Sequence, residues 1–311
     1  VDGLDARGVP VVVLPSRSLD RDWIDGYADT LRRIAESIAL DPGPVDPGKV
    51  AIVGHFMDRN EGDGLGNVAE LRRIVRGVGL DPVSIWLDGG AWADLARAGS
   101  AGIVVSLPHG RAAASVLAER TGATLVEADL PFGTAASDRL VMALGTAASR
   151  ADEAAAFRDV SREEVGRAWE WLVPRRLLFR NLAFVGDPLM MPGFCEMADR
   201  IGCRVTALLA YGRCKPDVAP GTPGAAVLHC EPVFQPRQGD GVPDALRSVD
   251  LLVSNSWFTQ ECGAGESKLV ELGFPSRGYH CGFEAPYLGY RGALCLVDRI
   301  SNALGDRAVY V

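Results

Sequence analysis

A loop near the end of the chain carries three side chains suited to binding a metal or moving a proton. His280, Cys281 and Glu284 fall between an apolar lead at 272–275 and a glycine-rich segment at 289–292. Imidazole and thiolate groups are ligands for transition metals, and histidine titrates nearest to neutral pH. We predict that His280 contacts a metal or substrate, that Cys281 helps to bind the cofactor, and that Glu284 orients or charges the site. The alternative is that His280 is an ordinary surface residue with no role in a site.

Three further histidines, His55, His109 and His229, lie where predicted strands end. Ligands collect beyond the carboxyl ends of the strands in open parallel sheets, so a crevice there would gather these imidazoles. We predict that His55 and His109 are proton donors or polar residues of the same crevice as His280. The alternative is that each is simply a surface residue.

The turn at Phe132 and Gly133, after the fifth predicted strand, is another candidate. We predict that these two residues line the crevice and contribute to binding a cofactor. The plainer alternative is an ordinary helix start, in which Ser137 caps the helix and Asp138 complements its dipole.

All seven cysteines lie in the second half of the chain. Their odd number and wide spacing predict free thiols in a reducing compartment, and we expect the cytoplasm. No CxxC pair occurs, so a self-contained zinc or ferredoxin-type site is not expected. Three cysteines in apolar periodic segments are interpreted as core residues, and four remain as candidates for a thiolate-ligated centre: Cys195, Cys203 and Cys295 in the first group, and Cys214, Cys230, Cys262 and Cys281 in the second.

The elements that would position these residues alternate in type along the first half of the chain. Apolar runs rich in β-branched residues predict strands, and apolar residues at helical spacing predict helices. Asn67 and Glu70 are predicted to cap the second helix. The strands are expected at 9–14, 50–53, 83–87, 103–106 and 124–127, and the helices at 23–38, 67–76, 91–98, up to 121, and 137–146.

The second half repeats this order after a charged stretch at 147–164, which we interpret as a helical connector. The predicted fold class is α/β, with two doubly wound Rossmann-like parallel-sheet domains, residues 1–150 and 151–311, and an interdomain cleft lined by strand-end loops. The expected strands are 182–185, 204–209, 226–230 and 250–254, and the expected helices are 193–201, 243–247, 266–272 and one from the 289–292 segment to 304.

The composition excludes several classes of protein. The chain of 311 residues has a net charge of −8 and no basic run, so nucleic acid is not expected as a partner. No run of about 18 apolar residues occurs, which argues against a membrane span. A phosphate loop and a dinucleotide fingerprint are both absent, so we expect no nucleotide to bind this chain. The chain opens at Val1 without Met, which is compatible with a preceding segment.

The C-terminal segment also carries a family resemblance. The histidine loop, the Pro-Tyr-x-Gly-Tyr-x-Gly motif at 286–292 and the apolar helix that follows resemble the C-terminal signature of the nitrogenase component 1 family. This family includes nitrogenase catalytic subunits, cofactor-assembly scaffolds and dark-operative chlorophyll-pathway reductases. Segments 10–38, 120–144 and 180–203 are similar to consecutive blocks of the same subunits.

The resemblance has several implications for the site. His280 stands where cofactor-bearing subunits carry a histidine ligand to a metal cluster. An iron–sulfur or mixed-metal cluster shared with a partner is implied, as are assembly with a sister subunit or a second copy and electron supply from a separate ATP-dependent iron–sulfur reductase. Two features depart from the family pattern: Leu107-Pro108-His109 stands where the cysteine ligand is found, and no counterpart of the cysteine-bearing N-terminal domain lies ahead of Val9.

Two hypotheses of different class follow. The first is a subunit of a nitrogenase component 1-like oxidoreductase or metallocluster-assembly scaffold. The alternative is a two-lobed, hinge-type protein that binds a small molecule or metal without redox chemistry. A third option is a fragment or degenerate paralogue whose partner supplies all the cofactor chemistry.

Overall fold

The computed structural model describes residues 13–14, 21–56, 62–211, 226–230, 244–263, 267–274, 276 and 278–305. The chain divides into two compact units. The first comprises Val1–Met57 and Leu80–Ala128, and the second comprises Asp58–Gly79 and Asp129–Val311. This division differs from the predicted boundary near residue 150, because residues 129–150 and the segment 58–79 both group with the second unit.

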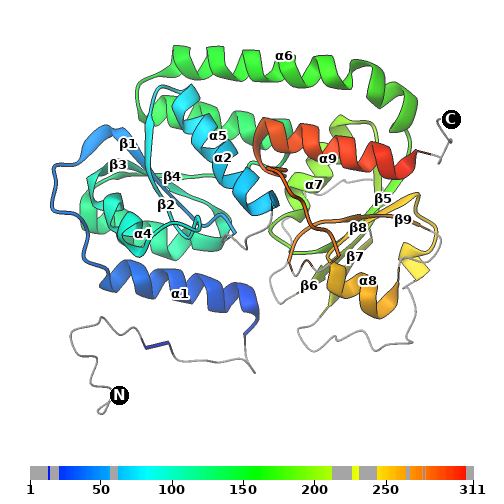
Figure 1. Cartoon of the computed structure of the whole chain (residues 1–311), viewed down its shortest axis with the longest axis horizontal. Helices are drawn as coiled ribbons and strands as arrows, with labels where there is room; N and C mark the ends of the chain where they lie inside the picture. The colour runs from blue at the N-terminus through cyan, green and yellow to red at the C-terminus, as the bar shows by residue number, and fades with distance from the viewer. Residues whose placement is uncertain are drawn as a thin grey trace. The chain divides into compact units, whose positions relative to one another are not determined.

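The first unit is built on a parallel four-stranded sheet with the order β2-β1-β3-β4 (Figure 1). Its strands confirm four of the predicted apolar runs. The predicted strand at 9–14 lies outside the described residues, except for positions 13 and 14, which are not in a strand. The bounds are β1 Asp46–Val53, β2 Asp81–Ile85, β3 Ala101–Ser106 and β4 Thr124–Glu127.

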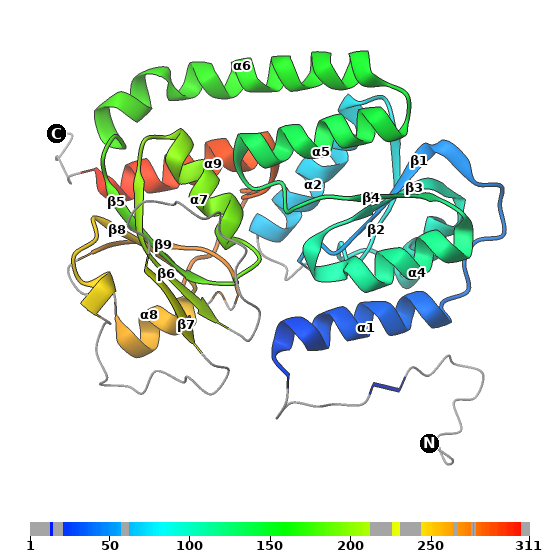
Figure 2. The ribbon, with the colours of Figure 1, turned by 180° about the vertical axis from the view of Figure 1, so that it is seen from behind.

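Helices α1 (Trp23–Ser37) and α4 (Arg111–Thr121) pack together over this sheet (Figure 2). Helix α1 starts at a capping box formed by Asp22 and Asp25, and α4 ends at Gly122, as predicted. The shared core holds residues from all of these elements, so burial of the apolar helix stripes fixes the helices on the sheet. Short segments α3 (Trp92–Ala96), η1 (Arg97–Ser100) and η2 (Pro108–Gly110) complete the first unit.

The second unit has a parallel five-stranded sheet with the order β7-β6-β5-β8-β9. The predicted helix at 266–272 is wrong, because residues 268–271 form the edge strand β9 paired to β8. A helix at 256–262 was not predicted; the side chain of Asn255 caps it by accepting the N–H of Phe258 at 3.0 Å. The strands are β5 Asn181–Gly186, β6 Arg204–Tyr211, β7 Ala226–Cys230, β8 Leu251–Ser254 and β9 Lys268–Glu271, and the unpredicted helix is α8 Ser256–Cys262.

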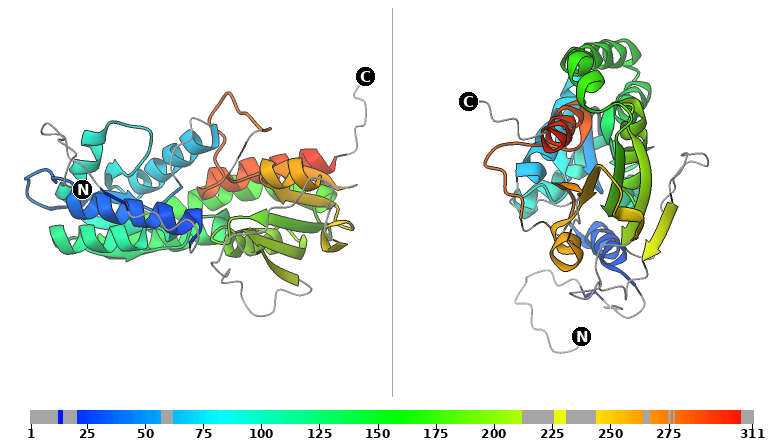
Figure 3. Two further views of the ribbon diagram at one scale, coloured as in Figure 1. Left: turned by 90° about the horizontal axis from the view of Figure 1, so that it is seen from below. Right: turned by 90° about the vertical axis from the view of Figure 1, so that its right-hand side faces the viewer.

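The long helices of the second unit pack against one another and against this sheet. Helix α9 contacts α2, α5 and α6, and it also lies beside β8 and β9 (Figure 3). Helix α6 confirms the predicted helical connector and extends it to residue 176. The bounds are α2 Gly62–Gly77, α5 Gly133–Ala147, α6 Ala151–Arg176, α7 Met191–Arg200 and α9 Gly289–Leu304; the predicted helix at 243–247 is the 3₁₀ turn η3 Asp244–Leu246.

Each sheet has one point at which the strand order reverses. In the first unit this point lies between β1 and β3, and in the second it lies between β5 and β8. The parallel strands with helical crossovers confirm the predicted α/β, doubly wound fold class. The carboxyl ends of these central strands are the positions where this architecture collects ligands. No helix among the described residues is long and apolar enough to cross a membrane.

Candidate functional site

His55 and His109 lie at the point of strand reversal in the first unit. His55 follows β1 and His109 lies in η2, directly after β3. The two loops touch, since the N–H of His109 donates to the carbonyl of Gly54 at 3.3 Å. Gly54 has a φ of 92°, and a Cβ there would lie 2.7 Å from the Cα of Gly110. Both histidines therefore occupy the predicted strand ends.

Aromatic rings enclose His109. Its imidazole lies 6.4 Å from the ring of Trp23, 6.2 Å from Tyr27 and 5.7 Å from Phe56, measured between ring centroids. The hydroxyl of Tyr27 donates to the carbonyl of His55 at 3.1 Å. His55 and His109 are each 1% exposed, so the alternative that they are surface residues is wrong. Their roles as proton donors stay predictions.

Trp23 and Tyr27 were not identified from the sequence, although one signal was present. These aromatic residues lie four positions apart in α1, which places both on one helix face. Both rings contact His109, which lies more than 80 residues later in the chain. The spacing of Trp23 and Tyr27 alone gave no reason to connect them with that histidine.

His229 is placed only in part. It lies within strand β7, rather than beyond its end as predicted, and it pairs in register with Ala210. The side chains of His229 and Cys230 are outside the described part of the chain, as is Cys214.

In the second unit, Pro131 and Phe132 lie against the C-terminal motif, and the next residue, Gly133, begins α5 beside Met197. Phe132 and Leu288 form an antiparallel bridge, and the N–H of Gly289 donates to the carbonyl of Pro131 at 2.6 Å. The ring of Phe132 lies 6.1 Å from that of Tyr287. The turn at residues 131–132 is therefore held against the C-terminal motif by backbone hydrogen bonding and by packing of the buried Phe132 ring.

The capping role considered for Ser137 and Asp138 is wrong. Helix α5 begins at Gly133, and the hydroxyl of Ser137 donates within the helix to the carbonyl of Gly133 at 2.5 Å. Asp138 instead accepts hydrogen bonds from the Tyr290 hydroxyl at 2.7 Å and from Nε of Arg162 at 2.7 Å. Burial, followed by the hydrogen bond to Asp138, raises the pKa of Tyr290, so the phenol keeps its proton.

The capping role predicted for Asn67 and Glu70 is wrong. The helix begins at Gly62, upstream of Asn67, and Oδ1 of Asn67 accepts the N–H groups of Tyr287 and Leu288 at 2.9 and 3.0 Å. Buried Glu70 accepts the N–H of Arg291 at 3.2 Å. These two side chains hold the motif in place, because they satisfy backbone donors that are buried with it.

Glu70 is itself held by a two-pronged ion pair with Arg73. Nε and Nη2 of Arg73 donate to the two carboxylate oxygens at 2.6 and 2.7 Å. Burial alone would lower the pKa of Arg73, but the hydrogen bonds and charge of Glu70 raise it. Arg73 therefore remains charged at every physiological pH.

The loop with His280, Cys281 and Glu284 connects β9 to α9. His280 and Glu284 are exposed and Cys281 is half-buried. The loop is attached to the start of α2: the N–H of Ala285 donates to the carbonyl of Gly62 at 3.0 Å, and a Cβ at Gly62 would lie 2.8 Å from the carbonyl oxygen of Cys281. The three predicted site residues of this loop are thus together, on an anchored backbone.

The available thiols do not form a cluster site within the described part of the chain. Burial raises the pKa of Cys195 to about 11 and that of Cys203 to about 12, so both are neutral thiols, which are poor metal ligands. Burial followed by Asp298 also raises the pKa of Cys295. Among the described residues, no three His, Cys, Asp or Glu side chains are grouped so that they could hold a metal. This donor set does not fit a metal cluster held by these residues alone.

Comparison with known proteins identifies the family. The model of the nitrogenase component 1 type oxidoreductases matches residues 2–305. The chain belongs to this family. It is 26% identical over 193 residues to the nitrogenase molybdenum-iron protein beta chain of Clostridium pasteurianum, an alignment covering 57% of this chain and 39% of that protein.

Solved nitrogenase structures have the same fold as this chain. The structure titled "Nitrogenase Cp1 at pH 6.5" matches with a TM-score of 0.68 at 18% identity, covering 91% of this chain and 65% of that one. "Nitrogenase Cp1 at pH 5" matches with a TM-score of 0.67 at 12% identity, covering 92% and 62%. The chain thus spans less than two thirds of the length of each of these relatives.

Proposed function

We propose that this chain is a subunit of a nitrogenase component 1 type complex. It receives electrons from an ATP-dependent iron–sulfur reductase and works in the cytoplasm with a sister subunit or a second copy of itself. The observation that carries this proposal is the family match over residues 2–305. The likeness of its two doubly wound units to solved nitrogenase chains agrees with it.

In this proposal, the loop from His280 to Glu284 is the chain's contribution to a site completed by the partner. His280 contacts the metal cluster or substrate, Cys281 contributes to binding, and Glu284 sets the local charge. The exposure of His280 and Glu284 supports a role toward a partner, and the contact of Gly62 with this loop supplies the rigidity that a site needs. The small donor set of the described residues agrees with ligands supplied from elsewhere.

The remaining predicted residues have separate roles. His55 and His109 are proton donors or polar residues at the strand ends of the first unit, where both side chains are buried. Phe132 and Gly133 support cofactor binding from the second unit, and the contact of Phe132 with the C-terminal motif is what supports this role.

Anaerobic co-purification tests the proposal. The chain is co-expressed with a candidate sister subunit, and iron, sulfide and visible absorption are measured before and after mixing with the reductase and ATP. We expect a brown oligomer with sulfur-to-iron charge-transfer absorption that accepts electrons from the reductase. Substrate turnover would identify an oxidoreductase, whereas transfer of the metal to an acceptor protein would identify an assembly scaffold.

Two variants sharpen the test. His280→Ala is expected to lower the metal content without changing the thermal melting temperature, whereas Asn302→Ala, at an exposed polar position of α9, should leave both unchanged. Unchanged metal content in His280→Ala would remove His280 from the site. A colourless monomer that binds zinc or a small organic molecule would contradict the subunit proposal and support the hinge-type alternative.

A further inference from the structure

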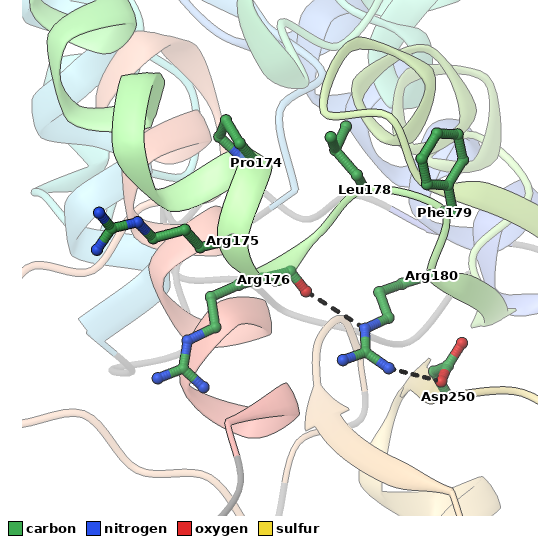
Figure 4. A pocket seen from close by; sticks show the side chains of 7 residues that line it. All are labelled: Pro174, Arg175, Arg176, Leu178, Phe179, Arg180 and Asp250. Atoms are coloured by element: carbon green, nitrogen blue, oxygen red, sulfur yellow. Dashed lines mark hydrogen bonds and ion pairs between the residues drawn. The ribbon is translucent and has the colours of Figure 1, made fainter.

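A pocket of about 350 Å³ lies where α6 ends, and its polar groups are already bonded to one another (Figure 4). Nε of Arg180 donates to the carbonyl of Arg176 at 3.4 Å, and Nη1 of Arg180 donates to Oδ1 of Asp250 at 3.2 Å. Figure 4 shows the guanidinium groups of Arg176 and Arg180 apart from each other. The described residues that line this pocket therefore offer no converging donors, whereas two thiols beside the C-terminal motif do come together.

These thiols are Cys281, in the histidine loop, and Cys295, in the second turn of α9. Both side chains are half-buried, although Cys295 was predicted to lie in the core. Cys195 and Cys203 are buried, as predicted. A thiol that is partly open to solvent can react, whereas an enclosed thiol is inert.

Cys295 lies on the face of α9 that is turned toward α2 and the histidine loop. Arg291, Cys295 and Arg299 follow one another at four-residue spacing, so they share one helix face. Nε of Arg291 lies 4.0 Å from Oε2 of Glu70 on α2. The guanidinium of Arg299 lies 4.0 Å from the ring centre of Tyr279 in the loop. Cys295 is therefore placed between a contact with α2 and a contact with the loop.

Cys281 is held from the same two directions. A Cβ at Gly62, the first residue of α2, would lie 2.9 Å from the Cβ of Cys281. Gly62 and Glu70 are two turns apart on one face of α2. The hydroxyl of Tyr279 forms a hydrogen bond with the thiol of Cys281. Both cysteines thus border the same face of α2 and the same tyrosine.

The electrostatics of this group agree with the geometry. Burial, followed by the charge of Asp298, raises the pKa of Cys295, and the charge of Cys281 contributes to the rise. Burial also raises the pKa of Tyr279 against the opposing charge of Arg299, and both cysteines add to the rise. Such effects act between close neighbours, so the two thiols and the phenol form one cluster.

We propose that Cys281 and Cys295 form a reversible disulfide that locks the histidine loop onto α9. The oxidant is a low-molecular-weight disulfide. The thiolate of one cysteine attacks a sulfur of the small disulfide and releases one small thiol; the second protein thiolate then attacks the mixed disulfide and releases the other. Two protein thiols are oxidised, the small disulfide is reduced to two thiols, and the two protons pass to the leaving thiolates.

The bond gives the histidine loop two chemical states. In a reducing compartment disulfides are usually transient and regulatory, which suits a pair that is partly open to solvent. The oxidised state removes the thiol of Cys281 from the donors at 280–284. This consequence rests on the proposed function, whereas the bond itself does not.

The test is oxidation of the reduced chain by oxidised glutathione at pH 8, without partner, metal or reductase. Remaining thiols are blocked with iodoacetamide, and tryptic peptides are analysed by mass spectrometry. Cleavage after residues 277, 291 and 299 places the two cysteines in separate peptides, 278–291 and 292–299, which the disulfide joins. We expect this linked pair to exceed every other linkage of Cys281 by about tenfold, because proximity raises the effective concentration of the second thiol. The excess should be lost in concentrated urea, and dithiothreitol should separate the peptides.

Cys281→Ser and Cys295→Ser should each abolish the linked pair. Cys203→Ser is the matched control and should leave it unchanged, since a serine hydroxyl can keep the hydrogen bond that the buried thiol makes with the carbonyl of Leu177. Glutathione adducts without the linked pair, or preferred linkage of Cys281 to another cysteine, would overturn the proposal. Because the assay needs neither metal nor partner, such a failure would leave the subunit proposal standing, and a complex that lacks a cluster would leave the disulfide standing.

Discussion

Tyr290 on α9 donates a hydrogen bond of 2.7 Å to Asp138 on α5. The same carboxylate accepts Nε of Arg162 on α6 at 2.7 Å, so one side chain ties three helices of the second unit together. Tyr290 is 1% exposed, and water is therefore a poor substitute for Asp138 as the acceptor of its hydroxyl. This contact fixes the start of α9 and, with it, the end of the histidine loop.

Tyr290→Phe should lower the free energy of unfolding by about 1–3 kcal/mol, because it removes a buried hydrogen bond to a charged acceptor. Urea denaturation at pH 7 measures this loss. Asp138→Asn and the double variant complete a thermodynamic cycle, in which the two changes should be non-additive. Strict additivity would show that the hydroxyl and the carboxylate contribute independently.

Gly289→Ala should destabilise the second unit by about 2–4 kcal/mol. Gly289 has a φ of 74°, and a Cβ there would lie 2.6 Å from Oε1 of Glu70. Gly282→Ala is the matched control in the preceding loop, since a Cβ at Gly282 meets nothing within 4 Å. Thermal melting of both variants checks the prediction, and similar losses in the two would contradict it.

Gly54→Ala should be among the most damaging single changes in the first unit, at about 3 kcal/mol or more, because the methyl group meets backbone atoms that have no room to move. Gly26→Ala serves as its control. Gly26 lies in α1 with open space around it, so alanine there should raise stability by about 0.5–1 kcal/mol. Opposite signs in urea titrations are expected, and a neutral Gly54→Ala would refute the close approach of the two loops.

Cys195 and Cys203 should resist alkylation at pH 7.5. Their pKa values of about 11 and about 12 leave almost no thiolate, whereas half-buried Cys281 is more accessible. Brief treatment with iodoacetamide followed by peptide mass spectrometry compares these sites within one sample. Labelling of Cys203 as fast as that of Cys281 would show that its thiol is not enclosed.

The same thiols predict a loss of stability in alkaline solution. Burial raises the folded-state pKa of Cys203 from 9.0 to about 12, so its contribution is complete below pH 9 and is lost as the pH rises through 12. Between pH 9 and 12 the thiol of Cys203 is ionised in the unfolded chain but still neutral in the folded one. The free energy of unfolding therefore falls by about 1.4 kcal/mol for each pH unit in this range. Cys203→Ala should flatten this slope in urea titrations from pH 8 to 10.5. An unchanged slope would assign the alkaline loss to other groups.

The central strands were predictable because parallel strands buried on both faces are continuous apolar runs, as at 103–106 and 182–185. Edge strand β9 was not, because four residues, Lys-Leu-Val-Glu, are too few to show a period. Its identity comes from pairing with β8. The start of α2 was not predicted for a related reason. Its first residues are rich in glycine, a composition that is typical of loops. These glycines are needed because residues 281–286 lie directly against Gly62 and Gly66.

The positions of the candidate histidines were predictable, and their surroundings were not. His55 and His109 follow strands, and that order is visible in the sequence. The rings that enclose His109 come from residues 23 and 27, far away in the chain, so no local pattern joins them. Likewise, Asn67 and Glu70 matched a capping pattern, but partners more than 200 residues later determine their role.

Helix α2 lies between β1 and β2 in the chain, yet it groups with the second unit. The polypeptide accordingly changes units after residues 57, 79 and 128. A gene fragment ending at 128 would encode α2 without α9, and the complementary fragment would lack Asn67 and Glu70. A single cut in the gene therefore cannot separate the coding sequence of one complete unit from that of the other. A recombination event with one crossover would divide at least one unit.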